Sequence, residues 1–114
     1  MRHLIFGILL FLFGQSLVWF QTNGQFVWPW IKKNPFWVSL FGGLVISYNF
    51  IIASREVVTY YGGSLWPGRF IGFATGMIAF SFLTYFIMNE GMNAKTLVSL
   101  GLATLLLCVQ LFWK

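Results

Sequence analysis

Few side chains in this sequence could carry chemistry. Its 114 residues include two acidic side chains, one histidine and one cysteine. Glu56, Glu90, His3 and Cys108 are scattered along the chain, with no metal-ligand spacing, no nucleophile beside a base and no phosphate-binding loop. We therefore expect no enzymatic activity, no cofactor and no bound metal ion.

Polar side chains within apolar stretches are the best functional clue. Gln15 and Asn49 each stand inside a long apolar run, where an amide group is costly and is often functional. If both faced one cavity with aromatic residues at its mouth, they would form a hydrogen-bonding site for a small organic solute. The sequence leaves open the alternative that both amides hold neighbouring helices together, at about 0.6–2 kcal/mol each. The expected solute-binding residues are Gln15, Asn49, Tyr60, Tyr61, Trp66 and Arg69.

The composition indicates that these residues lie in a membrane. Hydrophobic residues make up 59% of the chain and charged residues 8%, whereas a soluble domain carries about 25% charged residues. Four apolar segments each approach the roughly 20 residues that cross a bilayer as a helix. The sequence thus predicts an all-α, single-domain, polytopic membrane protein with four transmembrane helices and short loops. The expected spans are about residues 3–20, 36–54, 69–88 and 96–113.

The first apolar segment is interpreted as a retained helix. Arg2 precedes it as in a signal peptide, but no small-x-small cleavage site follows. Together with the compactness of the chain, this favours a bacterial-type inner (plasma) membrane. In the last hairpin, Asn93 is predicted to cap the fourth helix.

The net charge of +5 favours contact with membrane lipid over nucleic acid, because basic residues stand singly or in pairs at the ends of apolar runs. Their distribution gives almost no orientation bias under the positive-inside rule. Either the chain inserts into the membrane in both orientations, or contacts of the flanking residues or a partner protein determine its orientation. The terminal side with the second loop carries Arg2, Arg55, Arg69 and Lys114, and the other side carries Lys32, Lys33 and Lys95.

Glycine and serine residues recur at every fourth position in two of the predicted helices. In lipid, helices associate through close backbone approach, van der Waals contact and hydrogen bonds. A four-residue spacing lines up on one helix face, so these stripes predict helix-packing surfaces. The stripe in the third segment is Gly68, Gly72 and Gly76, and the stripe in the second is Ser39, Gly43 and Ser47.

Arg69 is expected at headgroup depth, where its guanidinium can extend to lipid phosphate. We expect Glu56 to form an ion pair, with the adjacent Arg55 or with Arg69. Because Arg55 and Arg69 are the charges nearest the expected mouth, a neutral or anionic solute fits better than a cation.

Roughly the last 75 residues of the chain resemble the small multidrug resistance family of the drug/metabolite transporter superfamily. The stretch IIASREVVTYYGGSLWPGRFIG is similar to the second-to-third helix segment of that family, with Trp66 and Gly68 at matching places. FIMNEGMNAKTLVSLGLATLLLCV is similar to the hairpin before the last helix, with Glu90 at the acidic position. Members carry a glutamate in the middle of the first helix, and this chain has Gln15 as the nearest polar residue there.

The resemblance implies a four-helix fold, an antiparallel dual-topology homodimer and a role in transport. The leading hypothesis is a small transporter-like protein that moves a small organic solute by alternating access as a homodimer. The alternative is a non-transporting structural or accessory subunit of a larger membrane complex, in which the small-residue stripes bind a partner.

Overall fold

A computed structural model describes residues 1–113, and Lys114, which we count on the terminal side, lies outside the described residues. The described chain is helical and contains no strand, which confirms the all-α prediction. Four of its helices are long and apolar enough to cross a membrane. The helices are α1 (Arg2–Asn23), η1 (Gly24–Phe26), α2 (Pro29–Lys33), α3 (Pro35–Tyr60), α4 (Trp66–Ile87) and α5 (Ala94–Phe112).

The observed helices coincide with the predicted spans except at their ends. α3 continues to Tyr60, well beyond the expected end at residue 54. It stops where Gly62 and Gly63 take φ angles of +67° and +100°, a conformation that favours glycine. The short helix α2 interrupts the predicted loop before α3, and Pro29 starts it at a position that needs no backbone donor.

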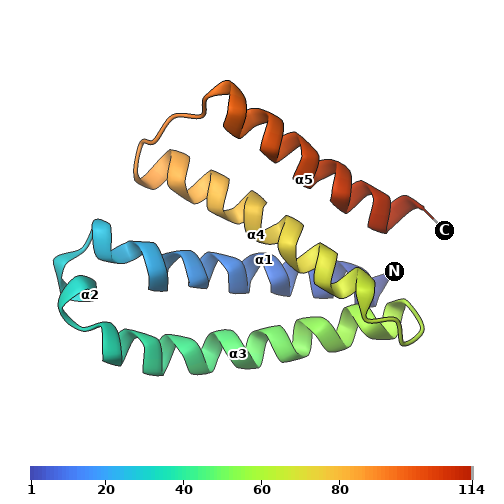
Figure 1. Cartoon of the computed structure of the whole chain (residues 1–114). Helices are drawn as coiled ribbons and strands as arrows, with labels where there is room; N and C mark the ends of the chain where they lie inside the picture. The colour runs from blue at the N-terminus through green and yellow to red at the C-terminus, as the bar shows by residue number, and fades with distance from the viewer. Residues whose placement is uncertain (114) are drawn as a thin grey trace.

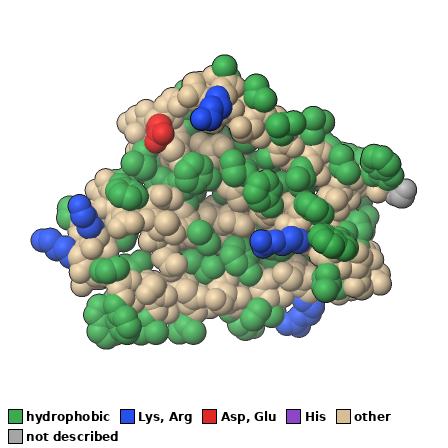
Figure 2. Space-filling model, in the orientation of Figure 1, with side chains coloured by type: hydrophobic (Ala, Val, Ile, Leu, Met, Phe, Trp, Pro, Cys, Tyr) green, Lys and Arg blue, Asp and Glu red, His purple; other side chains and the backbone are tan. Residues whose placement is uncertain are grey.

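The four long helices lie side by side in the order α3, α1, α4, α5 (Figure 1). The Cα atoms fill a slab of 46 × 36 × 18 Å, so the helices form one layer. α1 and α3 run antiparallel along their lengths, and α4 crosses α1 obliquely (Figure 1). A layer of this kind buries little of each helix inside one copy. Large apolar side chains accordingly cover much of the visible surface (Figure 2), as expected for a protein surrounded by lipid.

Glycines of α1 bring it close to α3. A Cβ atom added to Gly7 would stand 2.6 Å from Cγ2 of Val57, and one added to Gly14 would stand 2.6 Å from the ring of Phe50. Neither glycine belongs to the small-residue stripes read from the sequence. They allow α3 to lie against α1 along a contact whose buried centre includes Ala53 and Val57.

The glycine stripe of α4 faces α1 and α3. A Cβ on Gly68 would stand 3.8 Å from Val57, one on Gly72 would stand 3.3 Å from the Phe11 ring, and one on Gly76 would stand 3.0 Å from Cδ of Gln15. These glycines therefore make room for side chains of the neighbouring helices.

The second stripe, by contrast, has no packing partner within the described chain. Ser39 and Ser47 are exposed, and nothing lies within 4 Å of a Cβ added to Gly43. On the same helix, the neighbouring Gly42 contacts Gln21 of α1.

α5 lies at the edge of the layer and contacts α4 (Figure 1). Only Ala103 is buried among its residues. Asn93 caps its start as predicted, because its side-chain oxygen accepts a hydrogen bond of 2.8 Å from the backbone N–H of Thr96. Near its other end, the Tyr61 hydroxyl donates a 2.8 Å hydrogen bond to the carbonyl of Gln110.

Candidate functional site

An open groove of about 550 Å³ lies between α1, α3 and α4. α3 and α4 meet near the turn at residues 61–65 and diverge from it, with α1 between them (Figure 1). The groove lies where these three helices adjoin. Its lining residues are Phe11, Gln15, Phe50, Ser54, Val58, Leu65, Gly68, Arg69, Gly72, Phe73, Gly76 and Met77.

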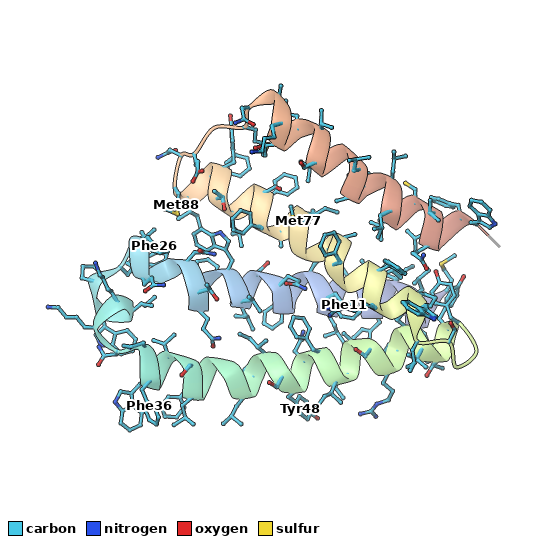
Figure 3. All side chains as sticks on the ribbon, in the orientation of Figure 1. Phe11, Phe26, Phe36, Tyr48, Met77 and Met88 are labelled. Atoms are coloured by element: carbon cyan, nitrogen blue, oxygen red, sulfur yellow. The ribbon has the colours of Figure 1, made fainter. Side chains whose placement is uncertain are left out.

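The lining is mostly apolar, with few polar groups. Phe11 and Met77, labelled in Figure 3, are two of the apolar residues and come from α1 and α4. Polar side chains enter from all three helices, as Gln15, Ser54 and Arg69. An apolar cleft with a small number of placed polar groups is the usual form of a small-molecule site.

Arg69 is the one charged side chain among the lining residues. Arg69 makes no ion pair within the described residues. Because neither glutamate belongs to the lining, the groove carries a single positive charge.

Gln15 lies on the floor of the groove against α4. Its Nε2 donates a 3.0 Å hydrogen bond to the carbonyl of Gly72. The same carbonyl accepts a 3.0 Å hydrogen bond from the Thr75 hydroxyl. The other amide atom, Oε1 of Gln15, accepts no hydrogen bond from the described residues. Gln15 therefore both joins two helices and presents a polar group to the groove.

Asn49 does not reach the groove. Its side chain is 8% exposed, and its Nδ2 donates a 2.7 Å hydrogen bond to the carbonyl of Leu10 on α1. The structure therefore does not bring Gln15 and Asn49 into one cavity, and that expectation is wrong. Asn49 joins α1 to α3, which is the helix-joining role that the sequence left open.

The expected aromatic mouth also lies outside the groove lining. The rings of Tyr60 and Tyr61 meet edge to face at 4.9 Å, and Tyr61 is turned toward α5. Burial, with a smaller contribution from Tyr60, raises the pKa of the Tyr61 phenol above its usual value of 10.0. Trp66 is exposed and stacks on Phe70 at the start of α4. This is close in the chain to Arg69, which is expected at the depth of the lipid headgroups.

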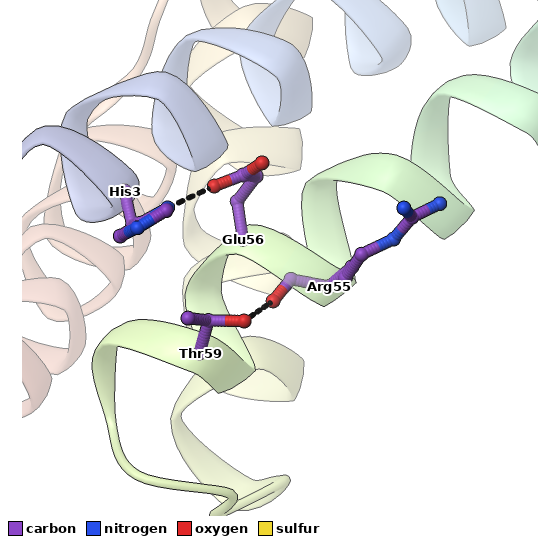
Figure 4. Close-up of polar contacts among 4 residues, drawn as sticks. All are labelled: His3, Arg55, Glu56 and Thr59. Carbon is purple, nitrogen blue, oxygen red and sulfur yellow. Dashed lines mark hydrogen bonds and ion pairs between the residues drawn. The ribbon is translucent and has the colours of Figure 1, made fainter.

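Glu56 pairs with His3 of α1, and the expected ion pair with Arg55 or Arg69 does not form in the described chain (Figure 4). Neighbouring residues on a helix point in different directions, so the Arg55 side chain leaves α3 away from Glu56 (Figure 4). The His3–Glu56 contact joins the start of α1 to the end of α3. Arg55, like Glu56, is absent from the groove lining.

Sequence reasoning missed the aromatic and sulfur-containing residues of the groove. Phe50, Ser54 and Val58 on α3 follow a four-residue spacing, and so do Arg69, Phe73 and Met77 on α4. Each set therefore lies along one helix face. This periodicity was visible in the sequence, but it could not show that the two faces lie beside one another.

A smaller hollow of about 270 Å³ lies between α4 and α5 near the last hairpin. Ser81 lines it and also lines a third hollow of about 250 Å³ between the same helices. α5 is therefore packed loosely against α4. Within residues 1–113, no group of three or more His, Cys, Asp or Glu side chains is placed to hold a metal ion.

No family model, curated protein or solved structure matches this chain.

Proposed function

We propose that this membrane protein binds a small neutral or anionic organic solute in the groove and moves it across the bilayer by alternating access. The observation that carries the proposal is the groove itself. It has the volume of a small-molecule site, and its lining holds the amide oxygen of Gln15 and the guanidinium of Arg69, which have no hydrogen-bond donor and no ion-pair partner, respectively, within residues 1–113. The resemblance to the small multidrug resistance family also favours a role in transport.

The proposed working unit is a homodimer. A slab 18 Å thick leaves the groove open, so one copy does not enclose a solute. A second copy, antiparallel to the first, would close it and would supply the two exchanging conformations that alternating access requires. The near-even distribution of basic residues between the two sides agrees with insertion in both orientations.

A bacterial-type inner (plasma) membrane is the proposed location. The spans are α-helices, whereas proteins of bacterial outer membranes are typically closed β-barrels.

Transport is tested with the full chain reconstituted in liposomes on a solid-supported membrane. A concentration jump of benzoate is expected to give a transient current in the wild type, with little current for benzyltrimethylammonium. The matched variants are Arg69→Gln, which removes the charge of the groove, and Arg55→Gln, which removes an arginine outside it. We expect the current to be lost in the first variant and kept in the second. Equal responses from protein-free liposomes would overturn the proposal.

The second candidate function is that of an accessory subunit of a larger membrane complex. Its specific support is α5, which buries only Ala103 and so leaves nearly a whole helix for a partner. Purification in mild detergent separates the two candidates. A lone dimer favours the carrier, and obligate co-purification at fixed stoichiometry with another chain favours the accessory role.

A further inference from the structure

We propose that the ligand of the groove is a single-chain amphiphilic anion, with its acidic head on Arg69 and its apolar body along α4. This inference rests on the proposed function, because it names the substrate class of the same groove.

The charge of the groove selects the head group. Arg69 is its one charged lining residue and forms no ion pair in the described chain. Arg69 is exposed at the start of α4, so its guanidinium is accessible to an anionic group. The coplanar N–H groups of a guanidinium can donate two parallel hydrogen bonds to one carboxylate. A carboxylate therefore complements the groove, and an ammonium group would meet repulsion.

The shape of the groove selects the body of the ligand. Phe73 and Met77 follow Arg69 at successive four-residue steps on the same helix face. With a rise of 1.5 Å per residue, the apolar lining extends roughly 12 Å beyond the arginine. Phe50 of α3 also lines the groove, and the centre of its ring is 5.9 Å from that of Phe11 on α1. These residues offer an apolar surface for one acyl chain or one slender aromatic body.

The volume and position of the groove favour one chain over a two-chain lipid. About 550 Å³ is the volume of a site for a drug-sized molecule. α1 fills the space behind the groove, since Phe11 and Gln15 lie against Gly72 and Gly76. A second acyl chain would have to lie outside, on the exposed surface of α3 or α4.

The test uses decanoic acid with a photoreactive diazirine in mid-chain, and the matching alcohol and ammonium compounds as probes. The purified full chain is placed in phosphatidylcholine nanodiscs, labelled by light and mapped by mass spectrometry. We expect the acid to label Phe73 and Met77 and to be displaced by unlabelled decanoate. The alcohol and the ammonium compound should label the same residues about tenfold less, the effect of losing one charge-assisted interaction.

Two arginine variants provide the matched comparison. Arg69→Gln should lower labelling by the acid about tenfold, Arg69→Lys should restore part of it, and Arg55→Gln should leave it within about twofold. Circular dichroism and elution volume show that each variant is folded. Equal labelling by acid and alcohol would overturn the inference. So would equal losses in the Arg69 and Arg55 variants, or displacement by phosphatidylglycerol and not by decanoate, which would assign Arg69 to bilayer lipid.

This binding measurement needs no transport. If the acid labels the groove as expected and no current appears on the supported membrane, the proposed transport fails while the ligand class stands. If benzoate currents appear and the alcohol labels as well as the acid, transport stands and the ligand class fails.

Discussion

The side chain of Gln15 lies across the glycine face of α4, and its Nε2 donates a 3.0 Å hydrogen bond to the carbonyl of Gly72. The close approach depends on the next glycine of the stripe, because a Cβ on Gly76 would stand 3.0 Å from Cδ of Gln15. The glycine stripe of α4 thus accommodates side chains of α1. The spacing of the glycines alone would fit the backbone of another helix equally well. This arrangement fixes Gln15 on the floor of the groove.

Gly76→Leu should therefore destabilise the protein. The added Cβ would stand 3.0 Å from Cδ of Gln15, so the Gln15 side chain would have to shift, and overpacking of this kind costs about 1–3 kcal/mol. The free energy of unfolding is measured by circular dichroism as SDS replaces a mild detergent. Gly101→Leu is the control, because nothing lies within 4 Å of a Cβ at Gly101. Equal stability of the two variants would show that α4 does not pack on α1 as described.

Replacing the interhelical amides should cost stability, and replacing a local hydroxyl should not. Gln15→Leu and Asn49→Leu each remove a hydrogen bond between helices, with an expected loss of about 0.6–2 kcal/mol in the free energy of unfolding. Ser16→Ala removes a bond from Ser16 to Leu12 within α1 and should leave stability unchanged. A Ser16→Ala loss as large as the other two would contradict the assigned roles.

The contact between His3 and Glu56 should add little stability. His3 is 49% exposed and Glu56 23% exposed, and exposed ion pairs contribute at most about 1 kcal/mol. We expect the thermal midpoint of Glu56→Gln to fall by no more than a few degrees. Glu90→Gln, which removes an acid without an ion pair in the described chain, should match the wild type. A collapse of the fold in Glu56→Gln would mean that this contact holds α1 against α3.

The hydrogen bond from Tyr61 to Gln110 should weaken in strongly alkaline solution. Burial raises the pKa of Tyr61 in the folded protein, so the phenol stays a donor at neutral pH. A group with a raised folded pKa contributes stability that is complete below its unfolded value, about 10, and is lost as the pH rises through the folded value. We expect faster amide exchange in the last turns of α5 at such pH, compared with the rest of the chain.

Tyr61→Phe is the control for that measurement. It should show the faster exchange in α5 already at neutral pH, with no further selective increase on alkalinisation. If the variant and the wild type exchanged alike at neutral pH, the bond to Gln110 would not be what holds the end of α5.

The four spans and the direction of the α4 stripe could be predicted because each depends on sequence-local properties. Apolar length determines a span, and the spacing of Gly68, Gly72 and Gly76 determines a face. Asn93 was likewise recognisable as a cap from its own position. The second span was expected to end near residue 54, with one further turn of helix left open after it, and α3 continues to the two glycines that stop it.

The groove itself could not be predicted, because it depends on which helices are neighbours. Asn49 and Gln15 are equally polar and equally central in their segments, yet Asn49 faces α1 and Gln15 faces α4. The same limit explains Glu56, whose partner His3 lies far away in the sequence. Gly7 and Gly14 were overlooked because their seven-residue spacing was not part of the four-residue pattern that identified the other stripes.

For an anionic solute to enter as proposed, the groove between α1, α3 and α4 must admit water and attract anions. The most direct test of this requirement is the reactivity of a single cysteine at Ser54, in a Cys108→Ser background, toward sulfonate and trimethylammonium methanethiosulfonates of matched size. The protein is in liposomes, and Leu102→Cys on the exposed face of α5 is the lipid-facing control. We predict that Ser54→Cys reacts, that the sulfonate reacts several-fold faster, and that Arg69→Gln abolishes this preference. A Ser54→Cys thiol as unreactive as Leu102→Cys, or one that prefers the cation, would contradict the account.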